Sequence, residues 1–411
     1  MGPSLKKQML WNAAGNVIYL ACQWLITVLV TRMGGFGDAG LLSVAMSFSA
    51  VFQTIAMFGI RNYQVSDLAG EYSDTQYVAF RVLTCSLAMA SCMAAALVMR
   101  YWSLQLLAVF LFMLFRLAEA FADVLHGIAQ KNGRLDLAGK SFAVKGVGLL
   151  AAFWLAYRFS GNLCLALFCM TAFTVVETAT FDRIAARRLS RFSAFAPLRG
   201  VLPMAIHTLP LCGYLFLHSA LSTVPKLVLE KMEGEEILGA YSAVFAPALL
   251  ISAAAIYLYQ PFIASFTGWH RGGERRRFLS GTALFLGVIA GLSVLVLAAA
   301  KLFGVPVLSF IFGEEIREYG DLLLPVLVGI VGVAVLSFLE TLEIILRDLV
   351  WLLIGCGAGL LAEVVSSVVL IRRVGANGAS YSIIIATALA AVILLIRVVC
   401  LAGKSGELTN E

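Results

Sequence analysis

Long apolar runs separated by short polar segments make up almost the whole 411-residue chain. A helix needs about 20 apolar residues to cross the hydrocarbon core of a bilayer, and twelve runs reach or approach that length. No connection between them is long enough to hold a separate domain. The pattern predicts an all-α polytopic membrane protein with helices over 9–31, 39–60, 78–99, 103–125, 141–158, 162–181, 202–224, 238–260, 279–301, 321–342, 349–371 and 379–400.

Composition strengthens this interpretation, because 61% of the residues are hydrophobic and only 13% are charged, against about 25% charged in a soluble domain. The first run follows Lys6 and Lys7 and has no cleavage pattern, so we expect an uncleaved first helix. The eight cysteines fall inside predicted helices without metal-ligand spacing, which favours small core residues and no metal site or cofactor. A net charge of +6 does not indicate nucleic acid binding.

Basic residues and an internal repeat predict the topology. Most of the 30 lysine and arginine residues fall on one side if both termini are cytoplasmic, with clusters in 183–191 and 271–277. Shifted by 199 positions, 32–45 aligns with 231–244 at four identities in fourteen, and each segment is an outer turn. We therefore predict two six-helix lobes, 1–195 and 196–411, related by a pseudo-two-fold axis along the membrane normal and enclosing a central cavity. The second lobe ends in a short cytoplasmic tail.

The fourth helix carries Arg116, Glu119, Asp123 and His126, which lie within roughly 80° of one another at 100° per residue. Ionisable groups in hydrocarbon are costly and usually face a protein interior or a wet cavity. One interpretation is an internal pair between Arg116 and Glu119, three residues apart, that neutralises itself. The other is one wall of a polar path through the membrane.

Two more helices carry polar stripes. Such residues also join spans by hydrogen bonds of about 0.6–2 kcal/mol, so each alone is explained by helix packing. Taken with the fourth helix, the stripes favour a central cavity. They are Asn12, Asn16, Tyr19 and Gln23 on the first helix and His207, Tyr214 and His218 on the seventh.

Isolated ionisable residues add two candidates. Glu363 lies near the middle of helix 349–371, where it is a proton or cation site or pairs across helices. Arg61 ends the second helix on the cytoplasmic side, where it receives an anionic head group or simply follows the positive-inside tendency. Apart from the histidines, Arg116 is the one basic side chain that the pattern places deep in a span.

The residues of several connections resemble the lipid-linked oligosaccharide flippases of the multidrug/oligosaccharidyl-lipid/polysaccharide exporter superfamily, of the O-antigen, capsule and teichoic-acid type. The resemblance covers essentially the whole chain through soft patterns, not invariant signatures. They are GIRNYQVSDLAGEYSD, FRLAEAFADVLHGIAQKNGRLDLAGKS, TVPKLVLEKMEGEEILGAYSAVF, FGEEIREYGDLLLP and VGANGAS.

The resemblance implies a V-shaped, alternating-access flippase that moves undecaprenyl-(pyro)phosphate-linked oligosaccharides across the bacterial cytoplasmic membrane. An ion gradient of Na+ or H+, or the membrane potential, would drive it without ATP, with Glu363 or Asp123 as the coupling acid. By position, Arg116 would hold the phosphate in the cavity and Arg61 would first meet the cargo. We expect a monomer whose partners are the lipid-linked glycan and membrane lipids.

Two other classes of function compete. A drug or metabolite cation antiporter of the same superfamily needs a membrane-embedded acid, which Glu363 or Asp123 supplies. An integral-membrane glycosyltransferase usually wants paired acids in the first outer loop, where only Asp38 occurs, and a polymerase commonly has a large outer loop. No phosphate-binding GxxxxGK[ST] loop is present for a nucleotide-driven pump. We therefore expect a transporter and not an enzyme.

Overall fold

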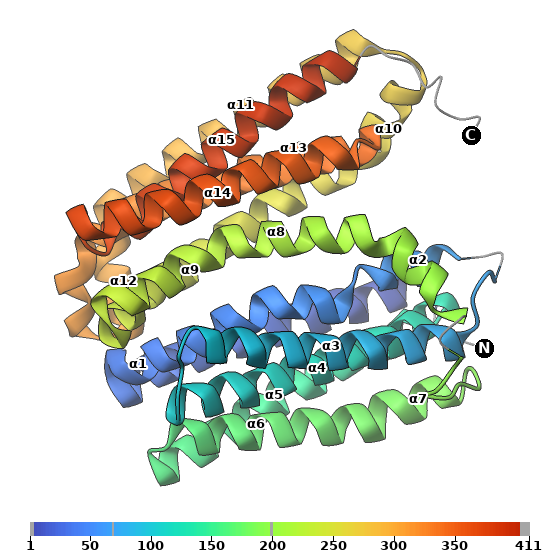
Figure 1. Ribbon diagram of the computed structural model, residues 1–411, viewed down its shortest axis with the longest axis horizontal. Helices are drawn as coiled ribbons and strands as arrows, with labels where there is room; N and C mark the ends of the chain where they lie inside the picture. Colours follow the sequence, from blue (N-terminus) through green and yellow to red (C-terminus); the bar gives the residue numbers. More distant parts are fainter. Residues whose placement is uncertain (1–3, 68–69, 198–199, 403–411) are drawn as a thin grey trace. The chain divides into compact units, whose positions relative to one another are not determined.

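The computed structural model describes residues 4–67, 70–197 and 200–402, and within them the side chains other than those at 5, 62 and 249–257. Every regular element in these ranges is a helix (Figure 1). Ten of the helices are long and apolar enough to cross a membrane. The chain is therefore an all-helical, multi-pass membrane protein. The tail predicted after the last helix, 403–411, lies outside the described residues.

The first element, α1 (Leu5–Met57), contains two of the predicted helices. Its 53 residues would span about 80 Å at 1.5 Å per residue, more than twice the hydrocarbon thickness of about 30 Å. Gly35 interrupts it with φ of +72° and ψ of −169°, a conformation that side chains disfavour. No atom lies within 4 Å of where a Cβ of Gly35 would be. The turn therefore requires glycine for its backbone angle and not for packing.

The structure divides into two compact units, Met1–Ser219 and Ala220–Glu411, and the division falls inside α8 (Leu202–Glu233). In unit 1, α1 packs against α3, α4 and α5, and α4 packs against α6. Ser73 and Gln76 form a capping box that starts α3, because each side chain binds the other residue's backbone amide. The other elements of unit 1 are α2 (Ile60–Ser66), α3 (Asp74–Val98), α4 (Leu104–Lys131), α5 (Leu135–Ser160), α6 (Leu163–Glu177), η1 (Thr178–Asp182) and α7 (Arg183–Arg187).

Glycine allows α1 and α5 to cross at close range. A Cβ at Gly15 would lie 1.9 Å from the Gly139 carbonyl oxygen, and one at Gly139 would lie 2.2 Å from the Trp11 carbonyl oxygen. Small residues at helix contacts let backbones approach within a membrane, where van der Waals packing drives association. This crossing fixes α5, and with it the buried side chains of the site described below, against the first half of α1.

In unit 2, α13 and α14 both pack against α15. Glycine again marks the close contact, since a Cβ at Gly378 would lie 2.4 Å from the Ile371 backbone nitrogen. The elements of this unit are α9 (Glu235–Tyr259), η3 (Gln260–Phe262), α10 (Ile263–Arg271), α11 (Arg275–Ala299), η4 (Ala300–Gly304), α12 (Val305–Phe312), η5 (Glu314–Leu322), α13 (Leu323–Leu346), α14 (Leu349–Val374) and α15 (Asn377–Leu401).

Most of each predicted apolar run is helical in the structure, whereas short α-helices were not predicted. These are α2, α10 and α12, with seven, nine and eight residues, and a fourth is α7, with five; all are far below the membrane-spanning length that the hydropathy criterion detects. The cysteines are free, but Cys400 is exposed near the end of α15, so the prediction of core positions is wrong for this residue.

Candidate functional site

Arg116 and Glu119 form an ion pair inside unit 1. Arg116 Nη1 donates to Glu119 Oε2 at 2.7 Å, and the two side chains are only 16% and 12% exposed. Gln23 of α1 donates to Glu119 Oε1 at 3.1 Å and to the Tyr19 hydroxyl at 2.7 Å. The Arg116 guanidinium also lies 5.2 Å from the centroid of the Phe112 ring, which adds a cation–π attraction. The internal pair is therefore present, and it is tied to the polar stripe of the first helix.

Asp123 is shared by two arginines from different helices. It accepts from Arg61 Nη1 of α2 at 2.9 Å and from Arg81 Nη2 of α3 at 3.0 Å. Arg61 also donates to Gln130 at 3.1 Å. Arg81 is fully buried and donates to the Ala56 carbonyl oxygen at 2.5 Å. Two positive charges meet one negative charge here, so the cluster carries one positive charge in excess.

Arg81 was not predicted as a site residue, because it lies close to the predicted start of helix 78–99, where the positive-inside tendency explains a basic residue. The structure also buries Lys145, so the expectation that Arg116 is the one deep basic side chain is wrong. Both residues lie inside candidate spans. Each is held by acids that are distant in sequence, and a carboxylate on another helix offsets the cost that burial imposes on a single charge.

Asp67, in the connection after α2, joins that helix to the start of α3. Burial penalises the charged form of Asp67, yet hydrogen bonds from the backbone amides of Glu71 and Tyr72 and from the Tyr77 hydroxyl lower the pKa of Asp67 below its usual range. The Tyr63 hydroxyl donates to Glu71 at 2.6 Å, and this bond raises the pKa of Tyr63 to about 12. Asp67 therefore fastens the end of α2 to the start of α3 while it is ionised.

His126 joins a second buried cluster on the side of α5 and α6. Its Nε2 lies 3.0 Å from Asp182 Oδ1, and Lys145 Nζ lies 3.0 Å from both Asp182 Oδ2 and Glu177 Oε2. Ser141 donates to Glu177 Oε1 at 3.0 Å. Three polar residues of α4 thus contact different elements. Glu119 contacts α1, Asp123 contacts α2 and α3, and His126 contacts α5 and η1.

Only some of the remaining predicted site residues contact one another. Asn16 donates to the Asn12 carbonyl oxygen at 2.8 Å, one turn away on α1. On α8, the rings of Tyr214 and His218 lie 6.0 Å apart, and Tyr214 is buried. His207 is exposed on the same helix. The predicted stripe of α8 is thus divided between buried and exposed positions.

Glu363 lies fully buried on α14 in unit 2. Neither of its carboxylate oxygens has a hydrogen-bond partner in the part of the chain that the structure describes. Two hydroxyl groups lie close to Glu363. Ser382 accepts from Ser367 at 3.1 Å, and the Tyr241 hydroxyl lies 3.1 Å from Ser380. A buried carboxylate among hydroxyl oxygens is suited to hold a proton or a small cation.

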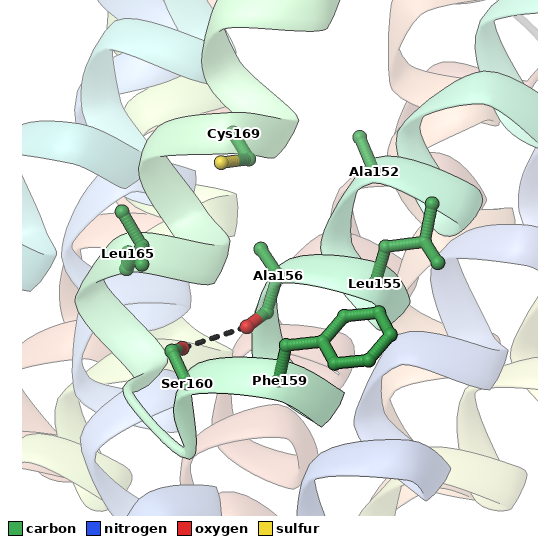
Figure 2. A pocket seen from close by; sticks show the side chains of 7 residues that line it. All are labelled: Ala152, Leu155, Ala156, Phe159, Ser160, Leu165 and Cys169. Carbon is green, nitrogen blue, oxygen red and sulfur yellow. Dashed lines mark hydrogen bonds between the residues drawn. The ribbon is translucent and has the colours of Figure 1, made fainter.

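A pocket of about 500 Å³ lies between α5 and α6 of unit 1. Figure 2 shows apolar side chains around it, among them Leu155, Phe159 and Leu165, and the bond from the Ser160 hydroxyl to the Ala156 carbonyl oxygen. Phe159 is 84% exposed. This pocket shares no lining residue with the polar clusters. Within the described ranges, no group of three or more His, Cys, Asp or Glu residues is placed to hold a metal ion.

Comparison with solved structures identifies the fold. A multidrug resistance MATE family transporter of the MOP superfamily, in an inward-facing conformation, matches with a TM-score of 0.66 and 16% identity over 97% of this chain and 96% of its own. The chain has the MOP-superfamily transporter fold. The lipid II flippase MurJ, in an inward closed conformation, also matches at 0.66 with 12% identity over 95% of this chain and 87% of its own. Transporters and a flippase therefore share this fold.

Sequence comparison adds a relative with a biosynthetic role. The capsular polysaccharide biosynthesis protein CapF of Staphylococcus aureus is 24% identical over 333 residues, which cover 79% of this chain and 82% of CapF. No protein-family model matches the chain. The resemblance drawn from the sequence patterns is thus confirmed. The fold is similar to those of transporters and a flippase, and the sequence is similar to that of a polysaccharide biosynthesis protein.

Proposed function

We propose that the chain is a flippase that carries undecaprenyl-(pyro)phosphate-linked oligosaccharides across the bacterial cytoplasmic membrane by alternating access. The observation that carries this proposal is the similarity to a capsular polysaccharide biosynthesis protein, which extends across 79% of the chain. The fold, shared with a lipid II flippase, supports it. An ion gradient or the membrane potential would drive transport.

The proposed topology has twelve spans in two lobes, 1–195 and 196–411, related by a pseudo-two-fold axis along the membrane normal. Both termini are cytoplasmic, and one chain is the working unit. The halves of α1 on either side of Gly35 would supply the first two spans. The head group would cross between the lobes while the polyprenyl tail stays in lipid.

The basic clusters would hold the phosphate. Arg61 is 27% exposed, and Asp123, which it shares with buried Arg81, leaves one positive charge uncompensated. A phosphate oxygen would balance that charge through a charge-assisted bond of about 1.5–3 kcal/mol. Arg116 would bind more weakly while Glu119 neutralises it. The sugars would contact the polar stripes of α1 and α8, namely Asn12, Asn16, Tyr19, Gln23, His207, Tyr214 and His218.

Glu363 supports an ion-coupling role better than Asp123 does. Asp123 lies between two guanidinium groups, whose positive charges repel a bound cation. Glu363 is buried, and the part of the chain that the structure describes offers its oxygens no hydrogen bond. Such an acid also suits a drug or metabolite cation antiporter, and the MATE fold keeps this second candidate open.

Native mass spectrometry of the full chain, purified from a bacterium that makes polyprenyl-linked glycans, tests the proposal. We expect an adduct with the mass of a polyprenyl (pyro)phosphate saccharide. The R61A/R116A double variant should lose this adduct. Variant R158A, which removes an exposed arginine at the end of α5, should keep it. Adducts of phospholipids alone would contradict the proposal, and an organic cation would favour the antiporter.

A further inference from the structure

Four ionisable residues meet in the interior of unit 1 without a role in the cargo site. His126, Lys145, Glu177 and Asp182 are at most 5% exposed. Lys145 Nζ lies 3.0 Å from one oxygen of each carboxylate, and His126 Nε2 lies 3.0 Å from the other oxygen of Asp182. They therefore form one continuous network, His126 to Asp182 to Lys145 to Glu177.

A π-helical turn builds this network. In an α-helix, residues five positions apart point about 140° away from each other. Glu177 and Asp182 are five apart, and the segment between them, η1, is a π-helix. Because a π-helix bonds residue i to residue i+5, it brings these two carboxylates to one face. Both can then reach the same ammonium group, which a regular helix would prevent. Single π turns of this kind occur frequently at functional sites.

The charges of the network sum to zero only if it holds one additional proton, which can sit on either of two residues. Lys145 contributes +1 and Asp182 contributes −1, so Glu177 must be compensated. Either Glu177 carries a proton and His126 is neutral, or Glu177 is ionised and His126 is an imidazolium. Any other state leaves a net charge in the membrane interior, which is costly. The His126 Nδ1 atom is buried without a hydrogen-bond partner in the described ranges, so a proton can bind there.

The neighbouring elements add few charges that would fix this proton. On α5, Ser141 donates to Glu177, and the Phe142 ring lies 5.0 Å from His126 and 5.5 Å from Tyr19 of α1. On α4 itself, Glu119 is paired with Arg116 and Asp123 with two arginines. These neighbouring charges are thus already paired, whereas the network can gain a proton at His126.

We propose that His126, Lys145, Glu177 and Asp182 form a proton-binding site that couples unit 1 to the proton gradient. This inference rests on the proposed transport function and identifies the coupling ion as H+. One proton binds from water at His126 Nδ1 or at a Glu177 oxygen. It leaves to water when a change of conformation wets the network, and no other bond forms or breaks. Lys145 and Asp182 act as positioning residues that keep the two acceptors electrically linked.

Spectroscopy of the full chain in lipid nanodiscs tests the site without any cargo. On acidification from about pH 8 to about pH 5, across the range where histidine titrates, ¹⁵N-histidine spectra should show His126 changing state. Infrared difference spectra should show a buried carboxylic acid band. Variant H126Q should lose the first signal, and E177Q should lose a component of the second that E363Q retains. Variant E343Q, which alters a fully buried glutamate of unit 2, should keep both.

Transport supplies the coupling readout. In vesicles with an imposed pH gradient, H126Q and E177Q should lose gradient-driven movement of a polyprenyl-phosphate glycan yet still equilibrate it without a gradient. Spectra that do not respond to pH, or unchanged gradient dependence in both variants, would overturn the proposal. Spectral signals without glycan movement in the wild type would support the proton site and refute the cargo, so the two failures are distinguishable.

Discussion

Removal of the Asp123 carboxylate should destabilise unit 1 severely. Its oxygens lie 2.9 Å from Arg61 Nη1 and 3.0 Å from Arg81 Nη2. Without the carboxylate, the fully buried Arg81 guanidinium would keep the Ala56 carbonyl oxygen and the Met57 sulfur as neutral partners. Loss of one partner of a buried ion pair costs about 3–5 kcal/mol. For a domain of this size, that cost corresponds to a fall of about 6–20 °C in melting temperature.

Two comparison variants separate burial from charge. Arg61→Gln removes the more exposed arginine and leaves the Arg81–Asp123 pair, so it should cost about 1 kcal/mol or less. The double variant Arg81→Met/Asp123→Ala removes both buried charges and should recover most of the lost stability, because a buried pair can be replaced by apolar groups at little cost.

Thermal unfolding in detergent, followed by tryptophan fluorescence, measures all three variants. The expected order of melting temperatures is Arg61→Gln close to wild type, then the double variant, then Asp123→Ala. If Asp123→Ala unfolds no earlier than Arg61→Gln, or if the double variant is as unstable as Asp123→Ala, then Arg81 is not held by this carboxylate in the folded protein.

Three further changes test other parts of the structure. Gly139→Leu should destabilise by about 1–3 kcal/mol or more through overpacking against Trp11, whereas Gly37→Ala, with no atom within 4 Å of its Cβ, should not; equal melting temperatures would refute the close crossing. The pKa of Asp67 is lowered on folding, so its stabilisation is present above its unfolded pKa of about 4 and lost as the pH falls through the folded value. In Asp67→Asn the melting temperature should fall less steeply as the pH is lowered. An unchanged fall would contradict the stabilising role of the Asp67 carboxylate. Glu363→Gln should weaken the dependence of transport on the proton gradient while leaving cargo binding intact, and an unchanged gradient dependence would exclude Glu363.

The sequence predicted features that depend on the residues of a single helix. It did not predict features that depend on contacts between several helices. The Arg116–Glu119 pair follows from helical spacing alone and was confirmed. The burial of Arg81 and Lys145 was not predicted, because their carboxylate partners lie 42 and 37 positions away in the chain.

The π turn at 178–182 was also invisible to a regular 100° periodicity. In a regular helix Glu177 only interrupts the apolar run 162–181, whereas the irregular turn makes it a partner of Lys145. By contrast, the twelve apolar runs required only hydropathy and length, which bilayer thickness fixes directly. Predictions from spacing therefore reached the helices and one ion pair but stopped at contacts between helices.

The most direct test of the central claim is flipping in reconstituted vesicles that contain a polyprenyl-phosphate glycan with a fluorescent sugar. An impermeant quencher reports how much label lies in the outer leaflet. The predicted result is exchange that depends on the protein and falls about tenfold or more in R61A/R116A, as expected for loss of a charge-assisted bond to phosphate, but not in R158A. Exchange no faster than in empty vesicles, or transport of an organic cation in its place, would contradict the claim.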